Sequence, residues 1–540
     1  METASSGLAL VDYAIFGVYV AVIICVGLLV SRRNRQSTEG YFLAGKSLPW
    51  WAVGASLIAA NISAEQFIGM SGSGFSIGLG IASYEWASAL TLLLVGKFFL
   101  PIFIKQEIYT IPQFVEKRYN NTLKTILAVF WICLYIFVNL TSVLYLGGLA
   151  LQTILGVPMM YSIFGLALFA VVYSVYGGLS AVVWTDVIQV AVLVFGGMAT
   201  TIMAVSFIGG EEGLFGGFGA MYDAAPGHFE MILEKDNPQF MNLPGIAVLI
   251  GGMWIANAYY WGFNQYIIQR TFASKSVDEA QKGLIFAAFL KLIIPFIVVI
   301  PGIAAFVIIN DPELMAKLGD MATSHMPSDA HADYAYPWLT QFLPAGIKGV
   351  VFAALAAAIV SSLASMLNST ATIFTLDIYK QYVDKNASDA RLVNVGRATS
   401  LVAIVIACFV APLLGSIGQA FMYIQEYTGL VSPGILAVFM LGLFWKKTSA
   451  KGAIVGVLAS IPIALLLKFL PLEMPFLDQM FYTFILTCAT IIFVTLNTSE
   501  NDDDPNGIPL TKDVFATSSA FNIGAYAVLI ILAVLYSVFW

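Results

Sequence analysis

Charged residues are scarce in this chain, and so are histidine and cysteine. Asp, Glu, Lys and Arg make up 11% of the 540 residues, against about 25% in an average soluble protein. The three histidines and four cysteines form no HExxH motif and no Cys/His cluster, which leaves a metalloenzyme without support. The net charge of −7 lacks the basic footprint of a nucleic-acid-binding protein. We therefore expect neither an enzyme nor a partner of nucleic acid.

Apolar residues are what the chain has instead. They amount to 59% of the sequence, and the mean hydropathy is +0.86. A helix that crosses a bilayer needs about 20 mostly apolar residues. Fourteen such segments are found, and they predict an all-α polytopic membrane protein in contact with lipid: 8–31, 48–75, 78–104, 122–153, 159–176, 180–208, 243–262, 280–309, 345–378, 392–414, 417–444, 450–469, 475–497 and 519–540.

Lys and Arg are distributed unevenly between the loops. If the N-terminus is extracytoplasmic, nineteen of them fall in or beside cytoplasmic loops and four on the opposite side. Positive charge accumulates on the cytoplasmic side of membrane proteins. The asymmetry predicts that both termini are extracytoplasmic.

Ten of the segments divide into two sets of five, over 48–208 and 243–444. The first helix of each set is interrupted, by AANIS (Ala59–Ser63) in one and by IGGMWIANAYY (Ile250–Tyr260) in the other. Paired broken helices are typical of secondary transporters that bind their substrate at the bilayer midplane. Because five is odd, the second set must be inverted relative to the first. The flanking regions are then 1–47, with an extra helix, the extracytoplasmic loop 209–242, and 445–540, with three more helices.

Two clusters of small and polar residues suggest a cation site. A break at AANIS would release backbone carbonyls at mid-membrane, although small residues also suit a helix–helix contact. In segment 345–378, Ala358, Ser361 and Ser362 share one helix face, where close packing is again the alternative. Two hydroxyls with carbonyls form a neutral oxygen site that suits Na⁺. Each cluster supplies what the other lacks, so together they favour the ion site.

Charged side chains at membrane depth need partners. Lys291 lies in an apolar helix, and Glu85, one turn before Ser88, is its candidate partner. Such a pair is either purely structural or also presents hydrogen-bonding groups to a ligand hydroxyl.

Segment 243–262 and the residues after it place Asn257, Tyr260, Trp261 and Asn264 at spacings of one helix face. An aromatic ring beside amides is a typical sugar-binding arrangement, since the ring takes C–H groups and the amides take hydroxyls. An aromatic belt at the membrane interface is the alternative, and it also fits Tyr266.

Two further sites carry polar groups at membrane depth. Gln425 and Glu426 lie in segment 417–444. Asp186 is a lone carboxylate near a cytoplasmic helix end, where we favour a helix N-cap slightly over a stepping stone for a cation.

Several long motifs resemble the solute:sodium symporter family: SLPWWAVGASLIAANISAEQFIGMSGSG, YSVYGGLSAVVWTDVIQ, YYWGFNQYIIQRT, AALAAAIVSSLASMLNSTATIFT and YIQEYTGLVSPGILAVF. The resemblance covers essentially the whole chain. It implies the LeuT-like fold of two inverted five-helix repeats in a bacterial inner membrane. It also implies Na⁺-coupled symport of galactose, and of glucose, by alternating access, with no organic cofactor.

The resemblance carries roles to particular positions. Sodium would be bound by the carbonyls of Ala59, Ile62 and Ala358 and the hydroxyls of Ser361 and Ser362. The sugar site would comprise Asn61, Gln66, Glu85, Ser88, Asn257, Tyr260, Lys291 and Gln425. The gates would be formed by Met70, Tyr135, Tyr260, Trp261 and Phe421, with Asp186 on the sodium exit path.

Other interpretations remain open at this stage. Within the transporters, the solute could be myo-inositol, sialic acid or an amino acid, and Glu65 or Asp186 could couple protons. A channel would need a continuous polar pore or a ring of like residues, and a sensor would need an appended signalling module; neither is found. The sequence does not distinguish a monomer from a homodimer.

Overall fold

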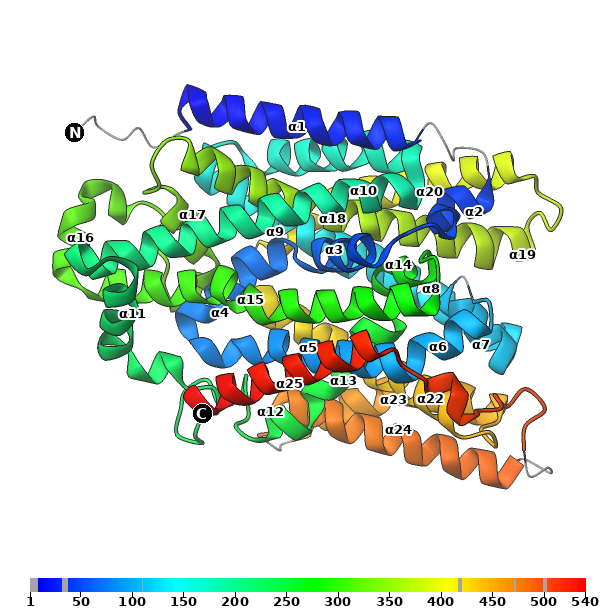
Figure 1. Ribbon diagram of the computed structural model, residues 1–540. Helices are drawn as coiled ribbons and strands as arrows, with labels where there is room; N and C mark the ends of the chain where they lie inside the picture. Colours follow the sequence, from blue (N-terminus) through cyan, green and yellow to red (C-terminus); the bar gives the residue numbers. More distant parts are fainter. Residues whose placement is uncertain (1–7, 32–36, 109, 416–419, 471–472, 499–502) are drawn as a thin grey trace.

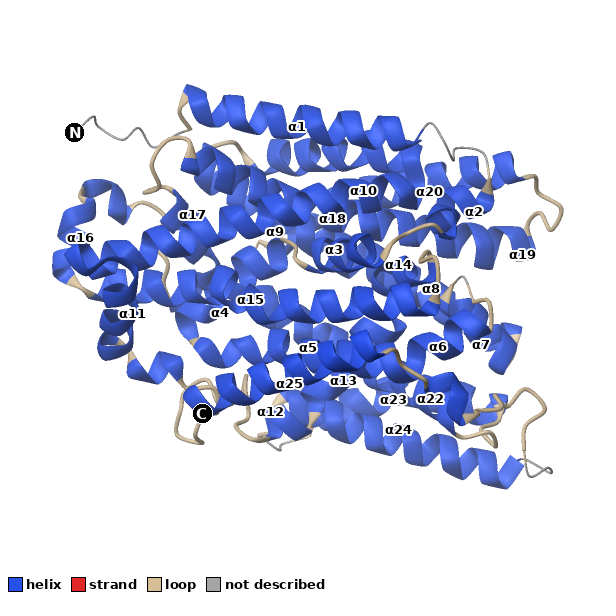
Figure 2. Ribbon diagram, viewed as in Figure 1, coloured by secondary structure: helices blue, strands red, loops and turns tan. Residues whose placement is uncertain are grey.

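The structure is a computed structural model, and it describes residues 8–31, 37–108, 110–415, 420–470, 473–498 and 503–540. Throughout these ranges the regular structure is helical, apart from one isolated bridge between Leu48 and Ser274 (Figure 2). The longer helices are α1 (Leu10–Ser31), α3 (Trp50–Asn61), α5 (Ser83–Leu94), α8 (Asn121–Leu134), α9 (Thr141–Leu155), α10 (Met159–Gly209), α13 (Gly252–Phe263), α15 (Val277–Asn310), α18 (Ile347–Ile373), α20 (Asp389–Val410), α21 (Ala420–Gly429), α22 (Ser432–Phe444), α23 (Ala450–Phe469), α24 (Phe476–Thr498) and α25 (Ser519–Val538).

Shorter helices complete or connect these. They are α2 (Thr38–Leu43), α4 (Ser71–Ser76), α6 (Leu100–Lys105), α7 (Ile111–Arg118), α11 (Gly213–Ala224), α12 (Ala247–Ile250), α14 (Gln265–Phe272), α16 (Pro312–Leu318), α17 (Ala335–Thr340) and α19 (Lys380–Tyr382). Four π-helical stretches extend neighbouring helices: η2 (Glu65–Met70), η4 (Val95–Phe99), η5 (Tyr135–Leu140) and η10 (Phe374–Tyr379).

Among the described residues, ten helices are long and apolar enough to cross a membrane, or eleven if the bent pair α21 and α22 forms one span. The remaining three of the fourteen predicted segments, 48–75, 159–176 and 243–262, contain shorter or interrupted helices. The count of fourteen and the inverted repeats therefore remain predictions. Most helices run side by side, and α1 begins at the same end of the molecule at which α25 ends (Figure 1).

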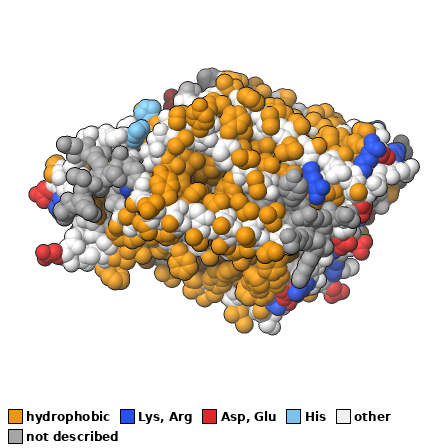
Figure 3. Space-filling model, turned by 90° about the horizontal axis from the view of Figure 1, so that it is seen from above, with side chains coloured by type: hydrophobic (Ala, Val, Ile, Leu, Met, Phe, Trp, Pro, Cys, Tyr) orange, Lys and Arg blue, Asp and Glu red, His pale blue; other side chains and the backbone are white. Residues whose placement is uncertain are grey.

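The surface matches a bilayer. On the face shown in Figure 3, hydrophobic side chains form a broad band, and the charged side chains gather toward the two ends. Burial decreases from the centre of the bundle outward. In the apolar membrane-spanning stretch of α18, 94% is buried inside the protein, against 17% in the corresponding stretches of α1 and α25. The protein is thus a multi-pass membrane protein in which α18 forms the centre of the bundle.

Breaks in three helices position the site. The helix that begins with α3 stops at Asn61 and resumes in η2. α10 bends at Gly178, where φ is +58° and a Cβ atom would lie 2.3 Å from the Tyr41 carbonyl oxygen, so glycine is required. This bend falls between the predicted segments 159–176 and 180–208.

The third interrupted helix has two breaks, and one of them lies within the predicted range. We expected an interruption within Ile250–Tyr260, and it lies near the start of that range, at Gly251, whereas Gly252–Phe263 is a continuous helix. The chain breaks before it, at Gly251, and after it, at Asn264, which has extended backbone angles. Asn264 therefore does not continue the helix face of Asn257 and Tyr260, because its helix ends one residue earlier.

Candidate functional site

The break after α3 redirects two backbone hydrogen bonds. In a continuous helix the Ser63 N–H would donate to the Ala59 carbonyl, but here it donates to the Gln66 side-chain oxygen at 2.9 Å. The Gln66 N–H likewise donates to the Ser63 carbonyl at 3.2 Å rather than to that of Ile62. The carbonyls of Ala59 and Ile62 thereby lose their helical donors and become available to a cation.

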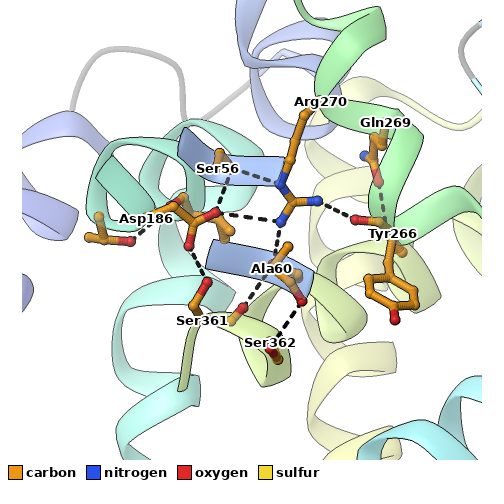
Figure 4. Close-up of polar contacts among 12 residues, drawn as sticks. Ser56, Ala60, Asp186, Tyr266, Gln269, Arg270, Ser361 and Ser362 are labelled. Atoms are coloured by element: carbon orange, nitrogen blue, oxygen red, sulfur yellow. Dashed lines mark hydrogen bonds and ion pairs between the residues drawn. The ribbon is translucent and has the colours of Figure 1, made fainter. Parts of the chain in front are cut away.

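α18 meets this break directly. The Ser362 hydroxyl donates to the Ala60 carbonyl oxygen at 3.0 Å, and both residues are fully buried (Figure 4). Ala358, one turn earlier on α18, is also fully buried. The structure thus brings together the two clusters in which we predicted sodium ligands. Ala60, whose carbonyl accepts the hydrogen bond from Ser362, is not among the predicted sodium ligands.

A buried ion pair lies beside the Ser361 hydroxyl. Ser361 donates to Asp186 Oδ1 at 2.5 Å, and Arg270 Nη2 approaches Asp186 Oδ2 at 3.5 Å (Figure 4). Ser56 connects the two groups, since Arg270 Nε donates to its oxygen and its hydroxyl donates to Asp186. Arg270 also donates to Ser365 Oγ. The network links α3, α10, α14 and α18 through side chains that are at most 1% exposed.

This network corrects the interpretation of Asp186 as a helix N-cap. The residue lies two turns beyond the bend at Gly178, inside α10, and its carboxylate bonds side chains of other helices. Arg270 was missed as a site residue, because in the sequence it looked like one more cytoplasmic positive charge. The buried Asp186 offered the only signal, since a carboxylate at that depth calls for a cation.

A polar cavity lies on the other side of the α3 break. Seven of the eight predicted sugar residues line it: Asn61, Gln66, Glu85, Ser88, Asn257, Tyr260 and Gln425. The eighth, Lys291, reaches its wall by bonding Glu85 Oε2 and Asn61 Oδ1. The predicted pair of Lys291 and Glu85 is confirmed, with 0% and 3% of the side chains exposed.

The other wall groups are also tied to one another. The Ser88 hydroxyl donates to Asn257 Oδ1 at 2.6 Å, and Asn61 Nδ2 donates to the Tyr260 hydroxyl at 3.0 Å. Tyr260 in turn accepts from the Tyr266 hydroxyl at 2.8 Å. Amides, carboxylates, hydroxyls and aromatic rings therefore converge on a single cavity, which is a donor and acceptor set for a ligand rich in hydroxyl groups.

The alternative of an interfacial aromatic belt is wrong for Trp261 and Tyr266. Their exposed fractions are 1% and 2%. The Lys291 ammonium lies 5.2 Å from the centre of the Trp261 ring. Trp261 therefore packs behind the ion pair instead of facing the bilayer.

Three of the predicted gate residues, Met70, Phe421 and Tyr135, do not all lie together. Phe421 packs against the backbone of Gly69, beside Met70, and its ring meets that of Tyr84 edge to face at 5.2 Å. Tyr135 instead donates to Asn264 Oδ1 at 2.5 Å and packs on Tyr266 at 5.5 Å. Tyr84 was missed, although it neighbours Glu85 in the sequence, and the structure groups Tyr135 with Tyr260 and Tyr266.

Glu65 adds a second carboxylate to the cavity wall. Its Oε1 accepts a hydrogen bond from the Ser142 hydroxyl at 2.8 Å. Glu426, by contrast, pairs with Lys468 at 2.8 Å and is not among the residues that line the cavity. Among the described residues, no group of three or more His, Cys, Asp and Glu side chains is placed to hold a metal ion.

The sequence matches the model of the sodium:solute symporter family over residues 41–460. The chain belongs to this family. A family member from Vibrio parahaemolyticus, named sodium/glucose cotransporter, is 73% identical over the full length of both chains. The human sodium/myo-inositol cotransporter 2 is 34% identical, over 90% of this chain and 76% of its own.

Two solved structures show the same fold. A Na⁺-coupled sialic acid symporter in a substrate-bound, outward-open state superposes with a TM-score of 0.78 at 24% identity, covering 91% of this chain and 98% of its own. A nucleobase-cation-symport-1 family transporter superposes with a TM-score of 0.51 at 14% identity, covering 92% and 99%. The symporter is therefore a Na⁺-coupled membrane transporter and not an enzyme.

Proposed function

We propose that this symporter carries galactose, and also glucose, into the cell together with Na⁺. The observation that carries the proposal is the double role of the stretch Ala59–Gln66. The Ala60 carbonyl in this stretch accepts the hydrogen bond from Ser362 of α18, next to the released carbonyl of Ala59, while Asn61 and Gln66 line the polar cavity. A cation that fixes this stretch would also fix part of the sugar site, which is a direct physical route to coupling.

The sodium ligands in this proposal are the carbonyls of Ala59, Ile62 and Ala358 and the hydroxyls of Ser361 and Ser362. The break supports the first two, and the bond from Ser362 to Ala60 supports the approach of α18. Asp186 lies next to Ser361 and would receive the ion on its way to the cytoplasm.

The sugar ligands are Asn61, Gln66, Glu85, Ser88, Asn257, Lys291 and Gln425, with Tyr260 against the sugar ring. The seven that line the cavity converge from α3, η2, α5, α13 and α21, and Lys291 joins them from α15. The neutralised pair of Glu85 and Lys291 favours an uncharged solute, and the name of the 73% identical relative supports a hexose.

Transport would follow alternating access. Na⁺ joins α3 and α18, sugar binds from outside, and the hydrophobic group at Phe421 and Met70 closes over it. Tyr260 and Trp261 then open toward the cytoplasm, and sodium leaves past Asp186. One Na⁺ moving through 100 mV supplies about 2.3 kcal/mol. That energy sustains roughly a 50-fold sugar gradient, at 1.4 kcal/mol per decade.

The proposal includes the membrane topology. Residues 48–208 and 243–444 would be two inverted repeats within fourteen spans of a bacterial inner membrane, with both termini extracytoplasmic. Two observations support this: α1 begins and α25 ends at one end of the bundle (Figure 1), and both predicted repeats contain a broken helix.

Myo-inositol is the second candidate solute. It is an uncharged ring of hydroxyl groups, so the same amides and the Tyr260 ring would suit it. The name of the 34% identical human relative supports it.

Uptake of labelled galactose into proteoliposomes tests the proposal. An inward Na⁺ gradient is compared with equal K⁺ and with choline. We expect accumulation with Na⁺ alone, and competition by glucose but not by proline. Little uptake of labelled galactose, together with Na⁺-dependent uptake of labelled myo-inositol, would favour the second candidate. Uptake that does not depend on Na⁺ would contradict the sodium site.

A further inference from the structure

A hollow with a cavity volume of ≈ 380 Å³ lies outside the pair of helices that carries Glu85 and Lys291. Its walls come from α5, α11, α15 and the end of the chain after α25. The lining is aromatic and aliphatic throughout, and it includes Trp86, Phe215, Phe218, Tyr222, Ile300 and Phe539. Its size is within the usual range for ligand pockets, about 300–1,000 Å³.

The hollow lies at the boundary of the bilayer. In Figure 1, α11 runs across the ends of the spanning helices, at the end of the bundle where α25 finishes. Phe215 is 88% exposed and Tyr222 is 53% exposed, yet both line the hollow. Aromatic residues on a helix that lies across a bundle end are typical of the membrane interface. The hollow therefore opens toward the edge of the hydrocarbon layer.

The lining decides what can fill such a space. Water is retained in cavities that offer two to four polar partners, and the side chains here offer little beyond one tyrosine hydroxyl. A sugar would lose its hydrogen bonds for the same reason. Hydrocarbon is the solvent around these helices and needs no polar partner. We propose that the acyl chain of a membrane lipid occupies this hollow as a defined site, separate from the sugar and sodium sites.

A bound chain would support the helices of the polar cavity from outside. Trp86 follows Glu85, and its Nε1 donates to the carbonyl of Leu292, which follows Lys291, at 3.4 Å. The same ring contacts Tyr536 of α25 at 5.6 Å. A lipid chain against Trp86 would therefore fill the space behind the bond that connects α5 to α15.

Photolabelling tests the site without sugar, sodium or transport, so its result is independent of the proposed function. The full chain is placed in nanodiscs of phosphatidylethanolamine and phosphatidylglycerol that contain a trace of phosphatidylcholine with a diazirine in the acyl chain. After illumination, labelled peptides are mapped by mass spectrometry. We expect labels concentrated on residues 213–229 and at Phe539.

Two variants make the test specific. Ile300→Trp fills the hollow, and Phe215→Asp places a charge at its mouth; each should reduce labelling of 213–229 about tenfold relative to the rest of the chain. Leu466→Trp and Tyr161→Asp are the matched controls, because both side chains are exposed elsewhere, at 62% and 73%. Labels spread evenly over the lipid-facing helices, or unchanged in both variants, would overturn the proposal.

Discussion

At the scale of single residues, Ser362 and the pair of Glu85 and Lys291 each join helices that are far apart in the sequence. Ser362 connects α18 to the break after α3, and the ion pair connects α15 to α5. All three side chains are at most 3% exposed. Removing the partner of any of them would therefore leave a buried polar group without a hydrogen bond, which costs free energy of folding.

Replacing Ser362 by alanine should weaken sodium activation. The variant loses one proposed sodium ligand and leaves the sugar residues intact. A hydrogen-bonding contact to a charged group is worth about 1.5–3 kcal/mol, so the Na⁺ concentration for half-maximal galactose uptake should rise about tenfold or more. Ser400→Ala is the control, because that buried hydroxyl bonds Leu367 and Gly396 away from the site. An equal loss of sugar affinity would contradict the assignment.

Replacing Glu85 by glutamine should destabilise the protein through Lys291. Breaking a buried ion pair leaves an uncompensated charge and costs about 3–5 kcal/mol. The melting temperature in detergent should fall clearly for Glu85→Gln. It should recover in large part when Lys291→Met is added, because the unpaired ammonium is then absent. A double variant less stable than Glu85→Gln would show that the cost does not come from the charge.

At the scale of elements, two carboxylates hold helix ends in place. Asp12 of α1 accepts hydrogen bonds from the Gly346 and Gly349 N–H groups at the start of α18, both at 2.7 Å. Asp333 accepts a bond at 2.9 Å from the N–H of Ala420, the first residue of α21. Orphan N–H groups and the helix dipole favour an anion at Asp12, and the Asp333 oxygen satisfies an N–H group at the start of α21.

Removing the Asp12 carboxylate should loosen α1 from α18. Asp12→Ala should cost about 1–2 kcal/mol, the usual effect of a lost helix cap, and Asp12→Asn should cost less because it keeps an acceptor. Thermal unfolding in one detergent compares them. Asp311→Ala is the control, since Asp311 caps the short, peripheral helix α16. Equal effects of Asp12→Ala and Asp12→Asn would mean that the acceptor is unimportant.

The contact between Asp333 and α21 should depend on pH. Burial raises the pKa of Asp333 to about 8, although the bond from Ala420 opposes the shift. A carboxyl group with a raised pKa stabilises the fold fully below its ordinary pKa, and this contribution is lost as pH rises through about 8. Hydrogen exchange in 420–429 should therefore accelerate between pH 6 and pH 9. Amide exchange also accelerates with pH in any peptide, and Asp333→Asn should leave only that ordinary acceleration. The same pH profile in Asp333→Asn and in the unchanged protein would contradict the prediction.

At the scale of the whole molecule, spacing and composition predicted the apolar segments, the break at AANIS and the partnership of Lys291 with Glu85. These follow from local pattern and from the cost of burying charge in a bilayer. They predicted the interruption that is found at Gly251 but not the further break at Asn264, because Gly251 and Gly252 already supply an interruption in that segment. They also missed Tyr84, whose contact with Phe421 depends on how α5 packs against α21.

The sequence by itself determined that this protein is embedded in a bilayer and that its helices carry a few polar groups at membrane depth. It also determined that those groups must be hydrogen-bonded or ion-paired. The reason is energetic, since hydrocarbon does not solvate a carboxylate, an ammonium or an open carbonyl. Only the tertiary structure decided which partners they find. Asp186 pairs with Arg270, Ser362 with Ala60 and Tyr135 with Asn264. Each of these contacts spans at least 84 residues of chain, a separation over which no local pattern carries information.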